Sequence, residues 1–542
     1  MAAAEFPVSQ GDPEVRTAVG RVRGRWDEAD GGTGVAVFRG IPFARPPVGE
    51  LRFLAPRRPA RWDGVLDAAA FGPVAPQALP AAVARSGPAQ DGTARRNGGP
   101  SGDDGNWLTL NVWTPDLSSA AAGRAGGGLP VLVWVHGGAY IFGSGSDPGY
   151  DGAILARLGV VVVTCNYRLG VEGFAQVDGA PANRGLLDVV AALGWVAENI
   201  ARFGGDPAAV TVFGESAGAG VVAALLAMPT AKGLFRRAIA QSVPGTFFAP
   251  DLASDITRAI AAQAGIAVAG SLPIGRPPTR EALATATPRR LVAAQMAVTA
   301  ALHEYGQWGP VALTVTPFSP VVDGDVLPRS PWRALLSGAA RDIDLLVGHN
   351  KDEYRLFIET GGKSGKITDA DTEQVLRAFA PAPFGAEAYR KAYPGIDPER
   401  LYEIVFSDWL FRMPSLHLAQ SHAASGGRTF LYELTYPAPA APEALGACHA
   451  LDVPLVWGGK PDGIGLFMTG PEPPAEFARL GGLMRSEWLA FAGHGDPGWP
   501  VYGTERRLAR IYDCPAAIDP YPEEVSMHLW ERHQFDAISL KG

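Results

Sequence analysis

The chain has 542 residues, of which 47% are hydrophobic and 19% are charged, a composition typical of a globular protein with a large core. Its net charge of −8 is small for this length and gives no reason to expect nucleic acid or an anionic membrane as a partner. No apolar run reaches the roughly 18 residues that a membrane span requires. We therefore expect a globular protein with no nucleic-acid or membrane partner.

The N-terminal residues and the cysteines bear on the compartment. Residues 1–20 lack the basic start and apolar stretch of a secretory signal, and three cysteines are too few for a disulfide framework. We therefore expect a cytoplasmic protein. No Cys and His residues cluster with metal-ligand spacing, so the sequence predicts neither a metal site nor a cofactor. It does not favour a monomer over a homodimer.

The first third of the chain combines short strands with loop-like insertions. Residues 20–53 are predicted as short strands joined by a Gly-rich turn at 29–34. Residues 78–105 and 118–128 are rich in small residues and poor in aromatic and β-branched ones. We interpret both as surface insertions, and the first as a mobile loop.

The following region alternates between apolar strands and helices. Helical spacing covers residues 186–203 and 217–228. Alternation of this kind predicts a mostly parallel sheet flanked by helices, with its chemistry at the carboxyl ends of the strands. The helix-rich stretch 250–310 is predicted as a cap over the site within a single domain, 1–542. The apolar strand runs are 131–135, 160–164, 209–213, 238–242, 345–347 and 430–434.

The segment 214–218, Gly-Glu-Ser-Ala-Gly, lies between a predicted strand and a predicted helix. A tight turn there needs small residues on both sides of the serine, and it raises the serine at a helix N-terminus with free backbone N–H groups. A bare Gly-x-Ser-x-Gly match arises by chance, but the strand before it and the helix after it are the context of a nucleophile elbow. The segment predicts Ser216 as the nucleophile of an α/β-hydrolase fold.

A second Gly-rich segment ends the strand run 131–135. Gly137 and Gly138 allow two backbone N–H groups to face one point, and Ala217 supplies a third. Together they are predicted to hold the oxyanion of a tetrahedral intermediate, each donor contributing about a hundredfold to a thousandfold in rate. The alternative is an ordinary Gly-rich turn, and the elbow downstream favours the oxyanion hole.

A serine nucleophile needs a base and an acid, which this fold places later in the chain. His449 is preferred because it lies in a loop after the late strand 430–434, although physical reasoning does not select it unaided. Asp352 and Glu353 both follow the strand at 345–347, and physical reasoning does not separate them. Seven histidines follow the strand at 345–347 and are the candidates for the base: His349, His417, His422, His449, His494, His528 and His533.

The chain resembles the type-B carboxylesterase family, the cholinesterase-like group, and within it the bacterial para-nitrobenzyl-esterase branch. The resemblance runs from about residue 20 to residue 514 and implies an α/β-hydrolase fold and ester hydrolysis. Besides the elbow, it is carried by the motifs at 38–44, 46–49, 110–115, 183–188 and 203–207.

The resemblance also implies roles for particular residues. The family's Asn-x-Asp-Glu motif reads 350–353 here, which implies Glu353 as the acid. Its Gly-x-x-His motif falls within 446–454, which implies His449 as the base. Gln241-Ser242 is similar to a pair that supplies a supporting serine, and Glu215 inside the elbow is a second support residue.

Three departures from the family pattern stand out, of which the first two bear on compartment and substrate. Ala75 and Trp107 occupy the positions of a disulfide found in many members, and the loss of both cysteines fits a reducing compartment. The loop 75–106 contains no aromatic residue. Choline-cleaving relatives use an aromatic face there, so choline esters are not expected as substrates. Tyr354 also stands where a glycine usually follows the acid.

The leading hypothesis is a serine carboxylesterase that hydrolyses small-molecule esters through an acyl-enzyme on Ser216. One alternative keeps the same triad but acts on carbamates, lactones or natural-product esters. Another is a catalytically silent, cholinesterase-like binding protein, which the retained serine, acid, histidine and glycines disfavour. Tyr140 and Phe142 are candidates for the substrate pocket, although core packing is the commoner fate of such aromatics.

Overall fold

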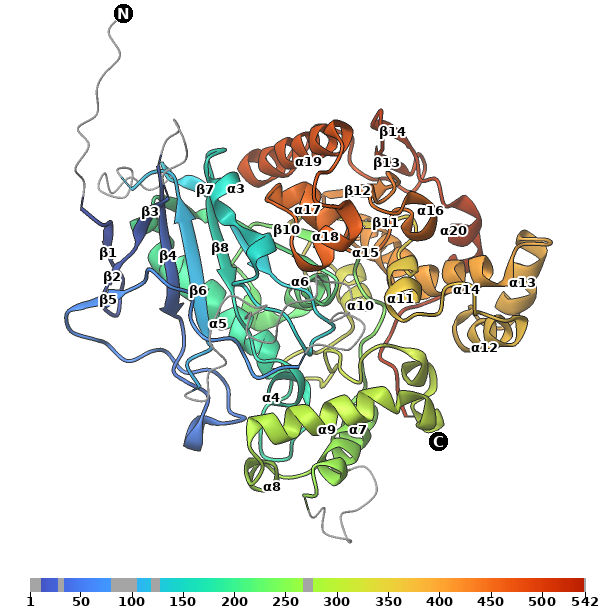
Figure 1. Cartoon of the computed structure of the whole chain (residues 1–542), viewed down its shortest axis with the longest axis horizontal. Helices are drawn as coiled ribbons and strands as arrows, with labels where there is room; N and C mark the ends of the chain where they lie inside the picture. Colours follow the sequence, from blue (N-terminus) through green and yellow to red (C-terminus); the bar gives the residue numbers. More distant parts are fainter. Residues whose placement is uncertain (1–10, 28–33, 79–104, 118–126, 267–275, 541–542) are drawn as a thin grey trace, which may run out of the picture.

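The structure is a computed structural model that describes residues 11–27, 34–78, 105–117, 127–266 and 276–540. Within these residues eleven strands form one mixed sheet (Figure 1). The strands from β8 to β13 in the spatial order run parallel, and those at both edges pair antiparallel. From edge to edge they are β14 (Ala517–Pro520), β13 (Leu508–Tyr512), β12 (Thr429–Leu434), β11 (Asp344–Asn350), β10 (Arg237–Gln241), β9 (Gly205–Glu215), β7 (Leu129–Val135), β8 (Val161–Cys165), β6 (Thr109–Thr114), β4 (Val35–Pro42) and β3 (Arg25–Asp27).

Helices cover both faces of this sheet. α5, α6 and α15 pack on one face, whereas α3, α17 and α19 pack on the other. The mostly parallel sheet between helical layers confirms the predicted fold class. The helices are α3 (Gly152–Ala156), α4 (Gly170–Phe174), α5 (Arg184–Asn199), α6 (Ala217–Ala227), α7 (Pro250–Gln263), α8 (Arg280–Ala284), α9 (Pro288–Ala300), α10 (Pro331–Leu336), α11 (Arg355–Thr360), α12 (Asp369–Phe379), α13 (Gly385–Ala392), α14 (Pro398–Ser407), the π-helical turn η7 (Asp408–Arg412), α15 (Met413–Ala424), α16 (Pro442–Leu445), α17 (Asp452–Trp457), α18 (Gly463–Thr469), α19 (Ala475–His494) and α20 (Glu524–Trp530).

The central strands bury apolar residues on both sides. In β7, Val131, Val133 and Val135 pack against one helical layer, while Leu132 and Trp134 pack against the other. Successive side chains of a strand point to opposite faces, so a strand covered on both sides requires a continuous apolar run. The six runs predicted from the sequence are confirmed as β7 to β12.

Two predicted boundaries are wrong by a few residues. β10 ends one residue before Ser242, whose φ of 58° lies in the left-handed region and cannot continue a strand. The helix predicted over 186–203 begins at Arg184 and ends in a 3₁₀ turn, η3 (Ile200–Phe203). Gly204 then stops the turn with φ 85°, a conformation that favours glycine.

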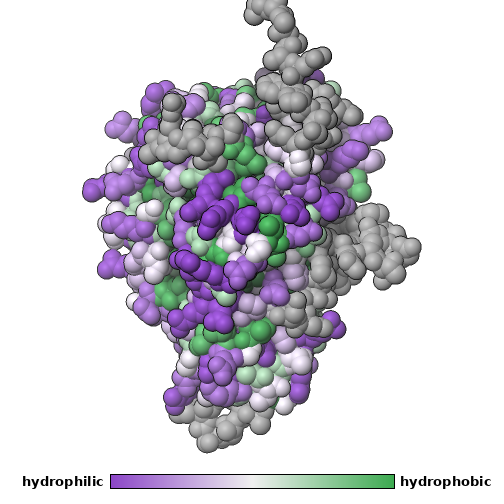
Figure 2. All heavy atoms as spheres, turned by 90° about the vertical axis from the view of Figure 1, so that its left-hand side faces the viewer, coloured by the Kyte–Doolittle hydropathy of each residue, from purple (hydrophilic) through white to green (hydrophobic). Residues whose placement is uncertain are grey.

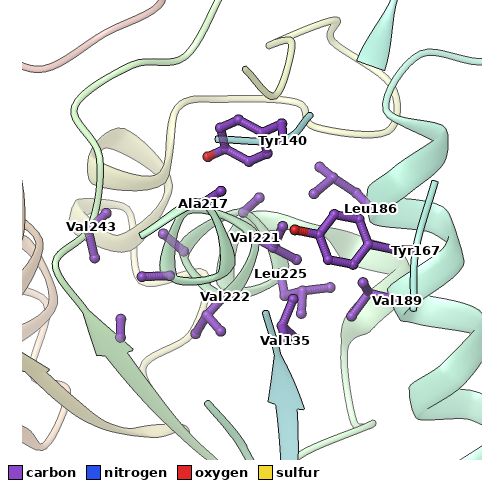
Figure 3. Packing of buried hydrophobic residues seen from close by; sticks show 14 of the residues in the cluster. Val135, Tyr140, Tyr167, Leu186, Val189, Ala217, Val221, Val222, Leu225 and Val243 are labelled. Atoms are coloured by element: carbon purple, nitrogen blue, oxygen red, sulfur yellow. The ribbon is translucent and has the colours of Figure 1, made fainter. Parts of the chain in front are cut away.

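Every residue of α6 is buried, including Val221, Val222 and Leu225. Figure 3 shows Tyr167 and other apolar side chains on one side of this helix and Val243 on the other. A helix buried all round needs no polar face, which explains its uniformly small and apolar sequence. The packing fixes the N-terminus of α6 inside the molecule, directly after Ser216.

The N-terminal strands form one flank of the molecule. β2 (Arg21–Arg23) pairs with β1 (Glu14–Arg16) and β5 (Val65–Asp67) in a small sheet, and β2, β3 and β4 confirm the short strands predicted over 20–53. Val22 points into the core, whereas its neighbours in β2 are exposed arginines. Figure 2 shows this flank with many hydrophilic residues and apolar patches between them.

Four predicted segments need separate mention. The insertions at 78–105 and 118–128 and the turn at 29–34 lie, apart from residues 34, 78, 105, 127 and 128, outside the described residues. The described part of 250–310 contains α7, α8 and α9 and no strand. In Figure 1 these helices lie together beside α4. None of the described helices combines the length and apolar character needed to cross a membrane.

Candidate active site

The turn between β9 and α6 holds Ser216 in a strained conformation. Its φ of 56° and ψ of −124° lie where residues other than glycine are rarely found. Its N–H donates to the carbonyl of Gln241 at 2.9 Å, and its side chain is partly exposed between buried neighbours. A strained serine raised between strand and helix is the geometry that the predicted nucleophile elbow requires.

The glycines on both sides of Ser216 are required by close backbone contacts. A Cβ atom on Gly218 would lie 2.1 Å from the carbonyl oxygen of Val135, and one on Gly214 would lie 2.7 Å from the same oxygen. Because these neighbours are backbone atoms of a central strand, they cannot move aside. The predicted need for small residues around the serine therefore has a direct steric cause.

The Gly-rich loop after β7 lies beside the serine. A Cβ atom on Gly137 would lie 3.3 Å from Cβ of Ser216, and Gly138 has φ 109° with only 2.0 Å available toward the carbonyl oxygen of Phe142. Among the described residues, the backbone N–H groups of Gly137, Gly138 and Ala217 donate no hydrogen bond. Three unused donors beside one hydroxyl suit the binding of an oxyanion.

Glu353 and His449 meet although 96 residues separate them in the chain. Nδ1 of His449 lies 2.6 Å from Oε2 of Glu353. The other carboxylate oxygen accepts hydrogen bonds from the Ser242 hydroxyl at 2.6 Å and from the Asn350 N–H at 2.8 Å. Glu353 is fully buried, so these donors replace the water that an exposed carboxylate would bind. The predicted acid, base and supporting serine are thus in one network.

Asp352 points away from His449. Its Oδ1 lies 2.9 Å from Nη1 of Arg400 and 3.4 Å from Nη2 of Arg355, and its Oδ2 accepts the Ala447 N–H at 3.0 Å. Burial by itself raises the pKa of Asp352, but the two arginines outweigh burial and lower it. Of the two carboxylates that sequence reasoning left open, Glu353 is the one that contacts the imidazole.

The second imidazole nitrogen of His449 faces Glu215. Nε2 lies 3.0 Å from Oε1 of Glu215, and among the described residues the Ser216 hydroxyl makes no hydrogen bond. Burial alone lowers the pKa of His449, but the charges of Glu215 and Glu353 outweigh it and raise that pKa to about 9. Burial raises the pKa of Glu215 to about 8, more than the charge of His449 lowers it.

The two aromatics predicted for the pocket lie in different surroundings. Tyr140 is 2% exposed and packs against Phe174 with ring centroids 5.0 Å apart. Phe142 is only partly buried. Core packing therefore accounts for Tyr140, whereas Phe142 keeps surface that a substrate could contact.

Two aromatic rings that the sequence analysis did not predict lie against His449. Phe411 stacks on the imidazole with centroids 4.2 Å apart at 26°, and Phe357 lies 5.2 Å away at 38°. Phe357 follows Glu353 by four residues, so its place near the acid could have been inferred from the motif. Phe411 is on a helix distant in sequence, and no local pattern marks it.

This fold, with a serine raised on a strained turn at the carboxyl end of a central strand, defines an α/β-hydrolase of the serine-hydrolase class. Residues 11–507 match the carboxylesterase family. Para-nitrobenzyl esterase of Bacillus subtilis (strain 168) is 36% identical over 94% of this chain and 96% of its own length. Phenmedipham hydrolase of Pseudarthrobacter oxydans is 34% identical over 86% of this chain and 90% of its own.

Solved structures agree with the sequence comparison. The crystal structure of a carboxylesterase from Geobacillus stearothermophilus has a TM-score of 0.76 and 36% identity to this chain, covering 95% of it and 99% of its own length. The chain belongs to the carboxylesterase family and is a serine ester hydrolase whose substrates are small-molecule esters.

Proposed function

We propose that Ser216 is the nucleophile, His449 the general base and Glu353 the carboxylate that orients the base. The observation that carries this proposal is the 2.6 Å contact between Glu353 and His449, together with a strained serine whose hydroxyl makes no hydrogen bond within the described part of the chain. A serine hydroxyl is a weak nucleophile and needs an adjacent base to remove its proton. A buried carboxylate on Nδ1 keeps the imidazole in the tautomer that can accept that proton on Nε2.

The reaction then proceeds through an acyl-enzyme. Oγ of Ser216 attacks the ester carbonyl carbon while its proton moves to Nε2 of His449, and the carbonyl oxygen becomes an oxyanion held by the N–H groups of Gly137, Gly138 and Ala217. When the intermediate collapses, the carbon–oxygen bond to the alcohol breaks and the alkoxide takes the proton from Nε2. A water molecule then gives a proton to Nε2 of His449 and attacks the acyl carbon. This second intermediate collapses by breaking the bond to Oγ of Ser216, which takes the proton back while the carboxylic acid leaves.

Glu215 supports the base and sets the pH at which it works. Proton transfer from Ser216 requires Nε2 of His449 to exchange its 3.0 Å contact with Glu215 for the serine oxygen. A negative charge on Glu215 stabilises the imidazolium that forms, but it also keeps the resting imidazole protonated to higher pH. The base acts in its neutral form, so kcat/KM rises as pH increases through the pKa of His449.

Replacing Glu215 by Gln is expected to move this rising limb to lower pH by about one unit or more, because a carboxylate that raises the pKa of His449 is removed. The measurement is kcat/KM against pH for a chromogenic ester. Glu443→Gln is the matched control. Glu443 is exposed, so the rising limb of kcat/KM against pH is expected to stay in place in this variant. An unshifted limb in the Glu215→Gln variant would show that this carboxylate does not govern the base.

We propose that the helical stretch 250–310 covers one side of the site. Gln295 on α9 accepts the Val171 N–H of α4 at 3.3 Å, and the neighbouring Gly170 N–H donates to the Tyr140 carbonyl at 2.7 Å. These contacts connect the helical stretch to the loop that carries the oxyanion glycines. A wall of this kind restricts water and shapes the substrate pocket, which we place beside Phe142.

We propose the cytoplasm as the compartment in which the enzyme works. Cys165 and Cys448 are buried, Cys514 is exposed, and none of the three is paired. The family resemblance implies that Ala75 and Trp107 stand where many members carry a disulfide. A chain that keeps its thiols reduced suits a reducing compartment.

An organophosphate tests whether the site is catalytic or only binds ligands. We expect one equivalent of label on Ser216, found by mass spectrometry of the digested protein, because only an activated serine reacts quickly with such reagents. The Ser216→Ala protein is the control and should take up none. Full esterase turnover without label on Ser216 would place the nucleophile elsewhere, and neither turnover nor label would favour a silent binding protein.

A further inference from the structure

The helix behind the base contains a widened turn. α14 continues through η7 into α15, and within η7 the Met413 N–H bonds to the Asp408 carbonyl five residues earlier. Such π-helical turns are rare and are frequently found at functional sites. Pro414 follows at once and has no N–H to offer the Leu410 carbonyl. That carbonyl instead accepts the Gly245 N–H at 2.7 Å, which docks the turn onto the segment after β10.

The widened turn places Phe411 flat against the imidazole of His449. The two rings lie 4.2 Å apart at 26°, and Phe357 lies beside Phe411 with centroids 6.0 Å apart at 12°. Phe411 is 3% exposed, so its ring has little freedom to turn. Glu353 fixes the imidazole through Nδ1 in the plane of the ring, whereas Phe411 restrains it from the face.

The same helix also holds the turn that carries the acid. Arg412 Nη1 donates to the Lys351 carbonyl at 3.0 Å, and the buried Asp408 fixes this guanidinium with a contact of 2.6 Å. At the end of α14, the Ser407 hydroxyl accepts the Tyr354 N–H at 3.0 Å. The residues immediately before and after the Asp352-Glu353 pair are therefore bonded to the element that stacks on the base.

We infer that η7 positions the acid and the base relative to each other, with Phe411 as a positioning residue that holds the imidazole plane and stabilises its protonated form. The inference rests on the proposed role of His449 as base. An aromatic face attracts a cation above it, so the imidazolium formed when His449 takes a proton gains from the stacked ring. The carboxylates that act most strongly on His449 are Glu215, Glu353 and Asp452, and the contacts of Glu215 and Glu353 are with the two ring nitrogens.

Phe411→Leu removes the aromatic face and keeps an apolar side chain. We expect kcat to fall about tenfold with KM changed less than about twofold, since the loss affects proton transfer rather than ester binding. The rising limb of kcat/KM against pH should move to lower pH, because the imidazolium has lost a stabilising neighbour. Both quantities come from the same set of pH-dependent kinetics.

Phe379→Leu is the matched control. Phe379 is equally buried and stacks on Trp409 of the same turn, 4.2 Å away, but it is not in ring contact with His449. We expect a similar fall in Tm for Phe411→Leu and Phe379→Leu. Only Phe379→Leu is expected to keep the kcat of the parent and the position of the rising limb of kcat/KM against pH. If the two variants behave alike in kcat and pH profile, Phe411 only fills the core and the inference is wrong.

A second variant guards against a misfolded protein. Phe411→Tyr keeps the ring, so its kcat is expected to stay within about threefold of the parent, and a loss as large as that in Phe411→Leu would contradict an aromatic role.

His449→Ala separates this inference from the proposed function. Activity retained in His449→Ala would remove the base assignment itself, whereas an unaffected Phe411→Leu beside an inactive His449→Ala would remove only the positioning role.

Discussion

Replacing Ser216 by alanine is expected to lower kcat by about a millionfold, the loss seen when the nucleophile of a serine hydrolase is removed. The reason is that no acyl-enzyme can form, so only ester binding and the oxyanion donors remain to favour attack by water. KM should change little, because the hydroxyl contributes little to ground-state binding. The measurement is turnover of a panel of chromogenic esters of increasing acyl length, with protein concentration set high enough to detect the residual rate.

Ser486→Ala is the control for this change. Ser486 is exposed on α19 and donates to the Leu483 carbonyl of its own helix, so its loss should leave turnover intact. The Ser216 variant must also keep the parent Tm, since its side chain makes no hydrogen bond among the described residues that folding would lose. Turnover within about a hundredfold of the parent in Ser216→Ala would show that another group attacks the ester.

The central strands could be predicted because their burial leaves no choice of residue. A strand covered on both faces must be apolar at every position, as in 131–135, and this pattern is unlike that of a loop. β13 and β14 were not predicted, because they lie at the edge of the sheet and have half-buried or exposed residues such as Arg510 and Ile518. Their sequence is compatible with a loop, and the pairing of β13 with β12 and of β14 with β13 decides their conformation.

The elbow could be predicted because all its requirements are local. The strained turn at Ser216 needs glycine at Gly214 and Gly218, each within two residues of it. The five residues 214–218 therefore contain the whole sequence signal for the turn. The oxyanion glycines are nearly as local, since Gly137 follows directly from the end of β7. Where a site is made by a single turn, sequence reasoning reaches its geometry.

The base could not be chosen from the histidines by physical reasoning, because its role depends on contacts far apart in the chain. His422 is buried with one ring nitrogen near Thr429 and the other near the Ala340 carbonyl, so it serves the core. His349 is occupied in the same way by Tyr521. The loop position of His449 after the strand 430–434 favoured it, but only the resemblance to a family separated it from the other histidines.

Glu353→Gln is expected to lower kcat by about ten-thousandfold, because the amide imposes the wrong tautomer on the base. The Asn350 N–H can only donate, at 2.8 Å from Oε1, so the amide oxygen of Gln must occupy that position. The amide NH₂ then takes the place of Oε2 and donates to Nδ1 of His449. The imidazole is left with its proton on Nε2 and cannot accept the proton of Ser216.

Asp352→Asn gives the contrast that identifies the acid. Asp352 pairs with Arg400 and Arg355, so its loss should lower Tm by weakening the packing of α11 and α14 while kcat stays within about tenfold. Glu353→Gln removes no ion pair with an arginine, so we expect it to lower Tm less than Asp352→Asn does while it lowers kcat far more. The opposite result, in which Asp352→Asn abolishes turnover and Glu353→Gln retains it, would show that the imidazole is oriented by the neighbouring carboxylate. Each substitution converts one carboxylate to an amide, at adjacent positions in the chain. The difference in kcat between the two variants therefore reports which of the two side chains contacts the imidazole.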